Sequence, residues 1–297
     1  MSANSSTEAS SASGPSIWTR AYLLGLALIG VVLLVAYAPA VYLLVRDWLI
    51  DENVSHGFFV PIVVGYIIWQ ERDEIRKTPV EPNSLGLVIV VGAALQFYAA
   101  TLGVELFLAR TALVFALIGS VLYVYGAKML RKLAFPLFLL FFMIPLPAII
   151  YNQITLPLQF IASDLAEKVL SLVGVPVLRE GNILELPSQR LSVVEACSGI
   201  RSLLSLSFLS LVYGYFFEGR TWIRGALLAA TVPIAIIANA GRVTITGLLS
   251  EANPELARGV FHLAEGWVVF AVALVLLVVT HRVILLVFRV GAPAPRN

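Results

Sequence analysis

Long apolar runs separated by short polar segments constrain this chain more than any other feature of its sequence. The first run begins after Arg20 and extends to about residue 45, and further runs lie at 57–70, 85–103, 108–127, 133–150, 199–217, 225–249 and 263–288. A helix needs about 20 apolar residues to cross the hydrocarbon core of a bilayer. Only 13% of the 297 residues are charged, against roughly 25% in soluble domains. The sequence therefore predicts an all-α polytopic membrane protein with about eight transmembrane helices.

Basic residues in the short connecting segments predict how the chain crosses the bilayer. The segments "QERDEIRK", "KMLRK" and "EGRTWIRG" each carry at least two Lys or Arg residues. Because Lys and Arg accumulate in cytoplasmic loops, we expect eight spans with both termini in the cytoplasm. The Ser-rich tail over residues 1–16 is expected to be disordered. A single transmembrane domain over 17–290 and a short cytoplasmic tail over 291–297 complete the predicted organisation.

The longest segment between apolar runs, residues 151–198, then lies on the outer side. Its first part, "NQITLPLQFIASDLAEKVLSLVG", has apolar residues at helical spacing and predicts an amphipathic helix in the membrane interface. Its second part alternates apolar and polar residues around the turn-like "REGN", which fits a small β-hairpin. This segment leads directly into "VVEACSGIRSL", residues 193–203.

That stretch holds Cys197, the only cysteine of the chain, and the chain has three histidines, His56, His262 and His281. One cysteine excludes an internal disulfide, a cysteine-based zinc cluster and an iron–sulfur centre. The sequence offers no metal-ligand cluster, so we expect neither a metal nor another cofactor. The net charge of +2 gives no reason to expect a nucleic-acid partner.

The predicted topology brings three chemically active side chains to one membrane face. Cys197 lies at the outer start of the sixth span, and His262 lies at the outer start of the eighth. Arg242 lies within the seventh span, about 10 Å below the outer surface, where a charged group is costly and usually functional. His281 lies near the cytoplasmic end of the eighth span, whereas His56 lies in the first outer loop.

A cysteine, a histidine and an arginine are together sufficient for acyl transfer from a peptide bond. A neighbouring imidazole or guanidinium stabilises the thiolate form of Cys197. Arg242 can also stabilise the oxyanion of a tetrahedral intermediate. His262 can take the thiol proton and return it to a leaving amine.

Each of these side chains also has a structural explanation. A single cysteine in a membrane protein is more often a packing residue than a nucleophile. Arg242 can snorkel or pair with a carboxylate, and His262 can be an interfacial polar residue or a helix cap. The setting of Cys197 favours chemistry, because Glu195 and Arg201 flank it instead of Leu and Val.

Three motifs resemble those of a known family. "VVEACSGIRSL" resembles the cysteine signature of the exosortase/archaeosortase family of polytopic membrane cysteine transpeptidases, "NAGRVTITG" its second motif, and "HLAEGWVVF" its third. The first-loop stretch "SHGFFVPIVVGYIIWQER" is similar to the N-terminal region of that family. The likeness covers most of residues 45–280, in order.

The resemblance implies a membrane-embedded cysteine protease or transpeptidase. Its substrates would be exported proteins that end in a PEP-CTERM-type sorting signal, which consists of a Pro-Glu-Pro motif, a transmembrane helix and a basic tail. It would cut near that motif through a Cys thioester, at the periplasmic face of a bacterial inner membrane, often alongside exopolysaccharide genes. By motif, Cys197 would be the nucleophile, Arg242 the thiolate or oxyanion stabiliser, and His262 the acid and base.

Further residues are expected to bind substrate or to support the site. Glu195 could orient a catalytic group, bind substrate, or pair with Arg201. Ser198 would let a helix N-terminus approach the thiol. His56 and Asn239 are expected near the site. The glutamate of the substrate motif could meet a basic residue, for which Arg179, Arg190 and Arg201 are candidates.

Two other classes of protein remain open at this point. In a transporter or channel, Arg242, Glu105 and Arg110 could line a polar pathway, although hydropathy shows no clear paired halves. The other alternative is a non-catalytic scaffold in exopolysaccharide export.

Overall fold

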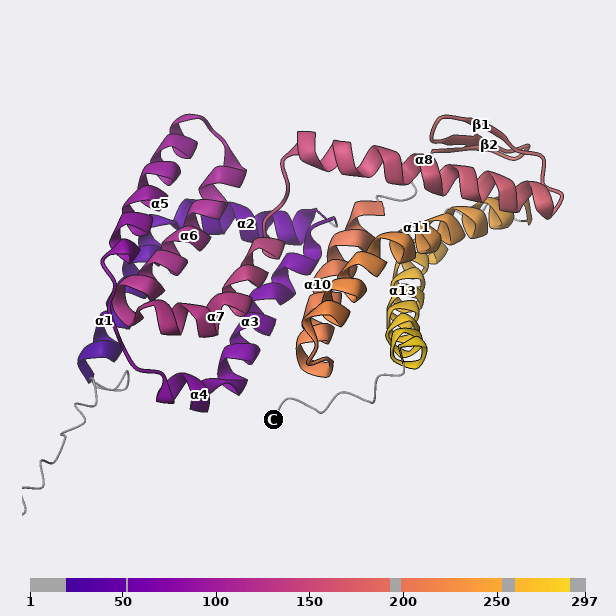
Figure 1. Cartoon of the computed structure of the whole chain (residues 1–297). Helices are drawn as coiled ribbons and strands as arrows, with labels where there is room; N and C mark the ends of the chain where they lie inside the picture. Colours follow the sequence, from indigo (N-terminus) through magenta and orange to yellow (C-terminus); the bar gives the residue numbers. More distant parts are fainter. Residues whose placement is uncertain (1–19, 52, 193–198, 253–259, 289–297) are drawn as a thin grey trace, which may run out of the picture. The chain divides into compact units, whose positions relative to one another are not determined.

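The computed structural model describes residues 20–51, 53–192, 199–252 and 260–288 (Figure 1). The chain divides into two compact units, Met1–Pro145 and Leu146–Asn297. Helices make up most of the described residues of both units, as the apolar runs predict. The all-α polytopic prediction is therefore correct in its class, and the two units are described one after the other.

The first unit consists of helices that follow one another with short connections. Its elements are α1 (Arg20–Ala36), α2 (Ala38–Ile50), the 3₁₀ turn η1 (Ser55–Phe58), α3 (Phe59–Gln70), α4 (Arg72–Lys77), α5 (Leu85–Leu102), α6 (Leu106–Tyr125), α7 (Ala127–Leu139) and the 3₁₀ turn η2 (Leu140–Met143).

Small residues hold the α5–α6 pair together. Gly86 of α5 and Gly119 of α6 let the two backbones approach so closely that a Cβ at Gly86 would lie 2.2 Å from the backbone nitrogen of Tyr123. Ala93 and Ala112 are buried in the same cluster between the helices of this unit. Such small-residue contacts are typical of helices that pack in a bilayer, where close van der Waals contact replaces the hydrophobic effect.

The charged residues at the start of α6 have structural roles. Arg110, of which 3% is exposed, donates from its NH2 to Oδ2 of Asp47 on α2 at 2.6 Å. Glu105 caps α6, since its carboxylate accepts hydrogen bonds from the backbone N–H groups of Phe107 and Leu108. These pairings explain both residues without the polar pathway that a transporter would need.

The second unit is built around one long helix. Its elements are α8 (Ala148–Leu172), β1 (Leu178–Glu180), β2 (Ile183–Glu185), β3 (Arg190–Ser192), α10 (Gly199–Phe217), α11 (Thr221–Ala252) and α13 (Val260–Val287). Helix α11 packs against α8, α10 and α13. The three strands form an antiparallel sheet in the order β1–β2–β3, and Figure 1 shows the sheet beside the C-terminal half of α8.

The structure does not confirm eight spans. Among the described residues, four helical stretches are long and apolar enough to cross a membrane: Leu85–Leu102, Leu106–Tyr125, Thr221–Ala252 and Val268–Val287. The number rises to six if each of two bent helix pairs counts as one span. Two further apolar helices in the described part of the chain, Ser55–Gln70 and Arg201–Phe217, are shorter than the 18 residues needed for a candidate span.

Prolines interrupt two of the expected continuous runs. The first run breaks at Tyr37, and α2 begins there with Pro39 in its first turn, so that the two helices are bent by 73°. Within the run expected over 133–150, the helical conformation ends at Met143, and the next helix starts only after Pro147. Ile144, which precedes Pro145, is extended because a proline disfavours the helical conformation of the residue before it.

The segment predicted as an interfacial helix and a hairpin folds differently in detail. Helix α8 starts at Ala148, within the expected fifth span, and continues to Leu172. The region after it forms three short strands, with Gly181 at φ +67° in the tight β1–β2 turn. The location of these elements on the outer membrane face remains a prediction.

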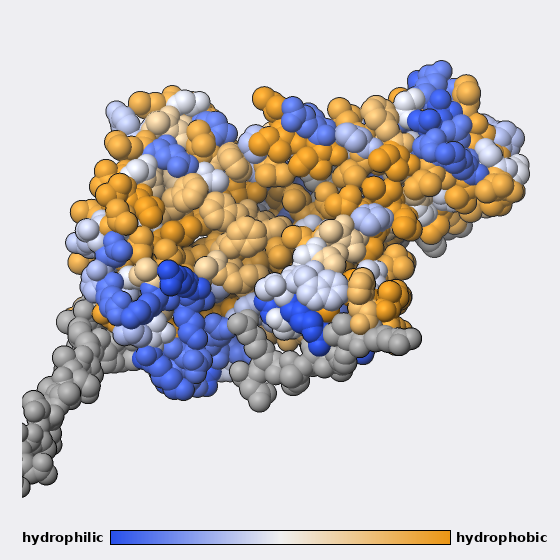
Figure 2. All heavy atoms as spheres, viewed as in Figure 1, coloured by the Kyte–Doolittle hydropathy of each residue, from blue (hydrophilic) through white to orange (hydrophobic). Residues whose placement is uncertain are grey.

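Surface hydropathy agrees with a membrane environment. Leu95 on α5 and Val268 on α13 are 64% and 60% exposed, as expected for side chains that face lipid. Figure 2 shows hydrophobic residues over much of the helical surface, whereas hydrophilic residues gather around α4 in the first unit and around the sheet in the second.

A buried polar network joins the turn between α10 and α11 to α13. Nδ1 of the His281 ring lies 2.8 Å from the hydroxyl oxygen of Tyr213, and Nε2 of the same ring lies 3.1 Å from Oε2 of Glu218. Glu218 also accepts a hydrogen bond from the backbone N–H of Arg220, and its backbone carbonyl accepts one from Arg224. Glu218 and His281 are 2% and 3% exposed. The network therefore fixes this end of the three helices.

We expect the Glu218 carboxylate to make stability depend on pH. Burial alone raises the pKa of Glu218, but hydrogen bonds from the Arg220 backbone and the His281 ring outweigh burial and hold the pKa below its ordinary value of 4.5. The stabilisation is therefore complete above about pH 4.5 and is lost as the pH falls through the folded-state pKa. Thermal unfolding in detergent should show the melting-temperature advantage of the wild type over Glu218→Gln shrinking below pH 4.5. An advantage that stays constant down to pH 3 would contradict the assignment.

Candidate functional site

The start of α10, the C-terminal half of α11 and the start of α13 lie toward the same end of the α10–α11–α13 bundle. Leu206, Ala238 and Val269 belong to one buried cluster that joins the three helices. The network of Glu218 and His281 marks the opposite end of this bundle, at the α10–α11 turn. The start of α10, the end of α11 and the start of α13 therefore lie beyond this cluster, on the side away from the α10–α11 turn.

Arg242 and His262 lie a short distance along their helices from this cluster. Arg242 is four residues beyond Ala238, a rise of about 6 Å at 1.5 Å per residue, and His262 is seven residues before Val269, a rise of about 10 Å. Gly199, the first residue of α10, follows Cys197 by two positions. The three chain segments thus approach one end of the bundle.

The structure describes some of the predicted side chains and not others. Glu195, Cys197 and Ser198 lie outside the described residues, and for His262 the structure gives the helix but not the side chain. Arg201, in the first turn of α10, and Arg242 are each half-buried, and the Nε atoms of both are buried. The meeting of Cys197, Arg242 and His262 in one site therefore remains a prediction.

Asn239 and Arg242 lie on the same face of α11, because residues three apart are neighbours on a helix surface. Asn239 is 5% exposed, and its side-chain nitrogen Nδ2 is buried with no hydrogen-bond partner among the residues that the structure describes. Next to Arg242, Val243 is fully buried in a second cluster with residues of α8 and of the sheet. The part of α11 around Val243 is therefore also fixed by packing against α8 and the sheet.

The sheet ends directly before the cysteine motif and packs against α11. Strand β3 ends at Ser192, one residue before the motif, and α10 begins at Gly199 within it. Leu184 and Leu191 of the sheet pack into the cluster of Val243. The β2–β3 loop is fixed to the end of α11, because Glu251 accepts from the backbone N–H of Ser188 at 3.0 Å and Ser250 bonds to the side chain of Gln189.

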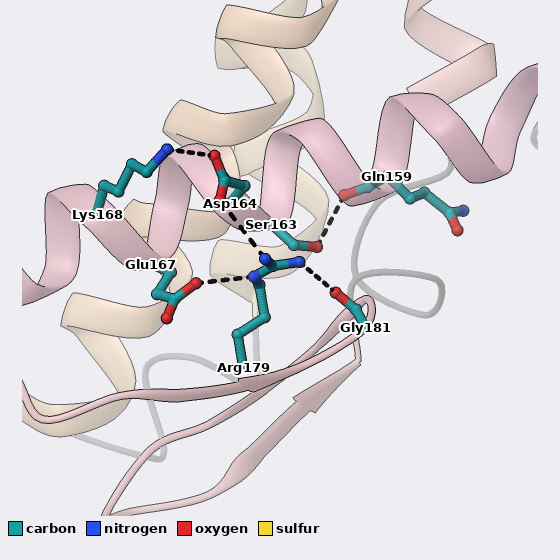
Figure 3. A network of polar contacts seen from close by, with 7 residues as sticks. All are labelled: Gln159, Ser163, Asp164, Glu167, Lys168, Arg179 and Gly181. Carbon is teal, nitrogen blue, oxygen red and sulfur yellow. Dashed lines mark hydrogen bonds and ion pairs between the residues drawn. The ribbon is translucent and has the colours of Figure 1, made fainter.

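An ion-pair network fastens β1 to α8 (Figure 3). Arg179 of β1 donates from Nε to Oε2 of Glu167 at 2.7 Å and from NH2 to Oδ1 of Asp164 at 3.5 Å. Its NH1 bonds to the carbonyl of Gly181 at 3.1 Å, while Lys168 pairs with Asp164. The Arg179 guanidinium therefore faces carboxylates of its own chain and is not poised for the glutamate of a substrate.

The other proposed basic contacts and His56 lie as follows. Arg190 of β3 pairs with Glu180 and Glu185, at 3.6 and 3.2 Å. His56 lies in η1 of the first unit, where burial lowers the pKa of its imidazole. Its expected place beside the site remains a prediction. Within the described part of the chain, no group of three or more His, Cys, Asp or Glu side chains could hold a metal ion.

Comparison with known families settles which family the chain represents. The model of the transmembrane exosortase family (Exosortase_EpsH) matches residues 48–279, most of the 297-residue chain. The chain belongs to the transmembrane exosortase family. No curated protein and no solved structure matches this exosortase. Family membership agrees with a multi-pass membrane protein and indicates a membrane transpeptidase role.

Two features of this exosortase were not predicted from the sequence. The Tyr213–His281–Glu218 network joins residues up to 68 positions apart, and topology alone indicated only that His281 lies away from the cysteine end. The pairing of Arg179 with α8 was also missed, although Asp164 and Glu167 interrupt the apolar face of that helix on the side where β1 packs. The helical spacing of these acidic residues was the signal that could have indicated a partner.

We expect Arg179→Ala to loosen the sheet of this exosortase, because two α8 carboxylates lose their common partner. Arg190→Ala is the matched control, since it also removes an arginine with two carboxylate partners, but one that lies within the sheet. Hydrogen–deuterium exchange over residues 178–192 should rise severalfold in the first variant and less in the second. Equal exchange in the two variants would show that the α8 pairing does not hold the sheet.

Proposed function

We propose that this exosortase cleaves the C-terminal sorting signal of exported proteins through a thioester on Cys197. The signal would contain a Pro-Glu-Pro motif, a membrane-spanning helix and a basic tail. The proposal is supported by the arrangement of the bundle, in which the start of α10, the part of α11 that holds Arg242 and the start of α13 lie toward one end, and by membership of the transmembrane exosortase family.

The proposed chemistry uses one group from each of the three helices or their leading segments. The imidazole of His262 takes the thiol proton, and the Cys197 thiolate attacks the carbonyl carbon of the scissile peptide. The guanidinium of Arg242 stabilises the thiolate and then the negative oxygen of the tetrahedral intermediate. When the C–N bond breaks, the amine leaves with the proton from His262, and water or an acceptor amine or hydroxyl releases the acyl group.

Supporting roles are proposed for the neighbouring residues. Glu195 orients a catalytic group or pairs with Arg201, and Ser198 lets the start of α10 approach the thiol. Arg201, four residues after Cys197 in the sequence, is proposed to meet the glutamate of the substrate motif. His56 would contribute to substrate binding or to the structure beside the site.

The site is proposed to face the periplasm, in the inner membrane of a bacterium. The short basic loops around α4, at the start of α7 and between α10 and α11 would then lie in the cytoplasm. In this orientation the anchoring helix of a substrate lies in the same bilayer, and its cleavage motif reaches the level of Cys197.

Replacement of the nucleophile tests the function directly. Cys197→Ala should abolish processing of a tagged substrate in cells, while membrane insertion and thermal unfolding stay unchanged. Ser210→Ala, which alters a buried hydroxyl on α10 outside the proposed site, should process normally. Trapping of a substrate thioester on Cys197, detected by mass spectrometry, should occur in the control and not in Cys197→Ala. Full processing by Cys197→Ala would instead support a transporter or a scaffold.

Labelling of the single cysteine tests the orientation. A membrane-impermeant maleimide added to intact spheroplasts should label the wild type at Cys197, because the site is proposed to face outward. Cys197→Ala provides the blank, since the chain has no other thiol. Labelling that appears only after the inner leaflet is exposed would overturn the proposed orientation.

A further inference from the structure

The side chain of Asn239 stands out among the buried polar groups of α11. The hydroxyls of Thr244, Thr246 and Ser250 each donate to a backbone carbonyl four residues earlier, at 2.9, 3.0 and 2.8 Å. The amide nitrogen of Asn239 is equally buried, yet it has no hydrogen-bond partner among the residues that the structure describes. An unpaired donor in a low-dielectric interior is costly, and this makes Asn239 a candidate to bind an acceptor that is present only during function.

The position of Asn239 indicates which acceptor this is. Asn239 follows Ala238, which lies in the layer where α10, α11 and α13 pack together, and it precedes Arg242 by one turn on the same face. Asn239 and Arg242 thus lie in the part of α11 that points away from the α10–α11 turn. A neutral amide donor next to a cation matches an oxygen atom that acquires negative charge.

We propose that Asn239 is a further catalytic residue, whose Nδ2–H donates to the oxyanion of the tetrahedral intermediate formed on Cys197. This inference rests on the proposed function. As the sulfur–carbon bond forms, the π electrons of the scissile C=O move onto oxygen, and the Asn239 amide meets the charge that develops there. When the C–N bond breaks, the electron pair returns to re-form the thioester carbonyl. Without substrate, this donor has no hydrogen-bond partner in the part of the chain that the structure describes.

The matched substitution is Asn239→Leu, which preserves the approximate volume and removes the hydrogen-bonding groups. Because an unpaired buried donor is lost, the melting temperature in detergent should stay the same or rise. Because a transition-state donor is lost, the single-turnover rate of Cys197 thioester formation should fall about 10²- to 10³-fold, with KM within about twofold of the wild type. A residue with a purely structural role would instead lower the melting temperature when replaced.

Thr244→Val serves as the control, because it removes a buried α11 hydroxyl whose partner is a backbone carbonyl. It should leave the rate of thioester formation unchanged. The inference is overturned if Asn239→Leu forms the thioester at the wild-type rate, if KM rises while kcat stays constant, or if the melting temperature falls together with the rate. If the wild type itself forms no thioester, the proposed function fails and this inference falls with it, an outcome distinct from a normal rate in Asn239→Leu alone.

Discussion

The packing of α11 on two sets of neighbours is the interaction on which the second unit depends. One half of this 32-residue helix packs against α10 and α13, and the other half lies against α8 and the sheet. Gly247 shows how close the second contact is, because a Cβ there would lie 3.2 Å from Leu170 of α8 and 3.6 Å from Leu186 after β2. Asn239 and Arg242 lie between the two contacts, so the directions in which they can point are set from both sides.

Much of the helical architecture could be predicted from the sequence, because an apolar run in a bilayer has few alternatives to a helix that satisfies its own backbone. The errors came where local chemistry overrides a hydropathy pattern. Hydropathy treats the proline-containing stretch after Met143 as apolar and continuous, whereas missing N–H donors and restricted backbone angles end the helix there. The third strand, β3, also escaped, because its pairing with β2 depends on contacts that no single strand pattern contains.

For the candidate site, the sequence could predict the placement of the helices but not the pairing of the polar groups. Chain order and the direction of the helices were enough to bring Arg242 and the starts of α10 and α13 to one end, because consecutive helices in a membrane alternate in direction. The sequence could not show which polar groups are satisfied by the protein itself. Arg179 looked available for a substrate until its three contacts with Glu167, Asp164 and Gly181 were seen, and Asn239 looked like any polar residue of a motif.

Among the described residues, the buried amide nitrogen of Asn239 differs in its pairing from Glu218 and His281 at the other end of the bundle, and this difference has a physical meaning. At the α10–α11 turn, Glu218 and His281 are buried and bonded to each other and to neighbouring groups, which stabilises the arrangement of three helices. A buried donor without a partner can persist at the opposite end only if the rest of the bundle supplies enough stability to offset its cost. Within the described part of the chain, the paired groups at the turn and the unpaired amide nitrogen of Asn239 are therefore complementary: the first stabilise the register of the helices in which, as we propose, the second meets its acceptor.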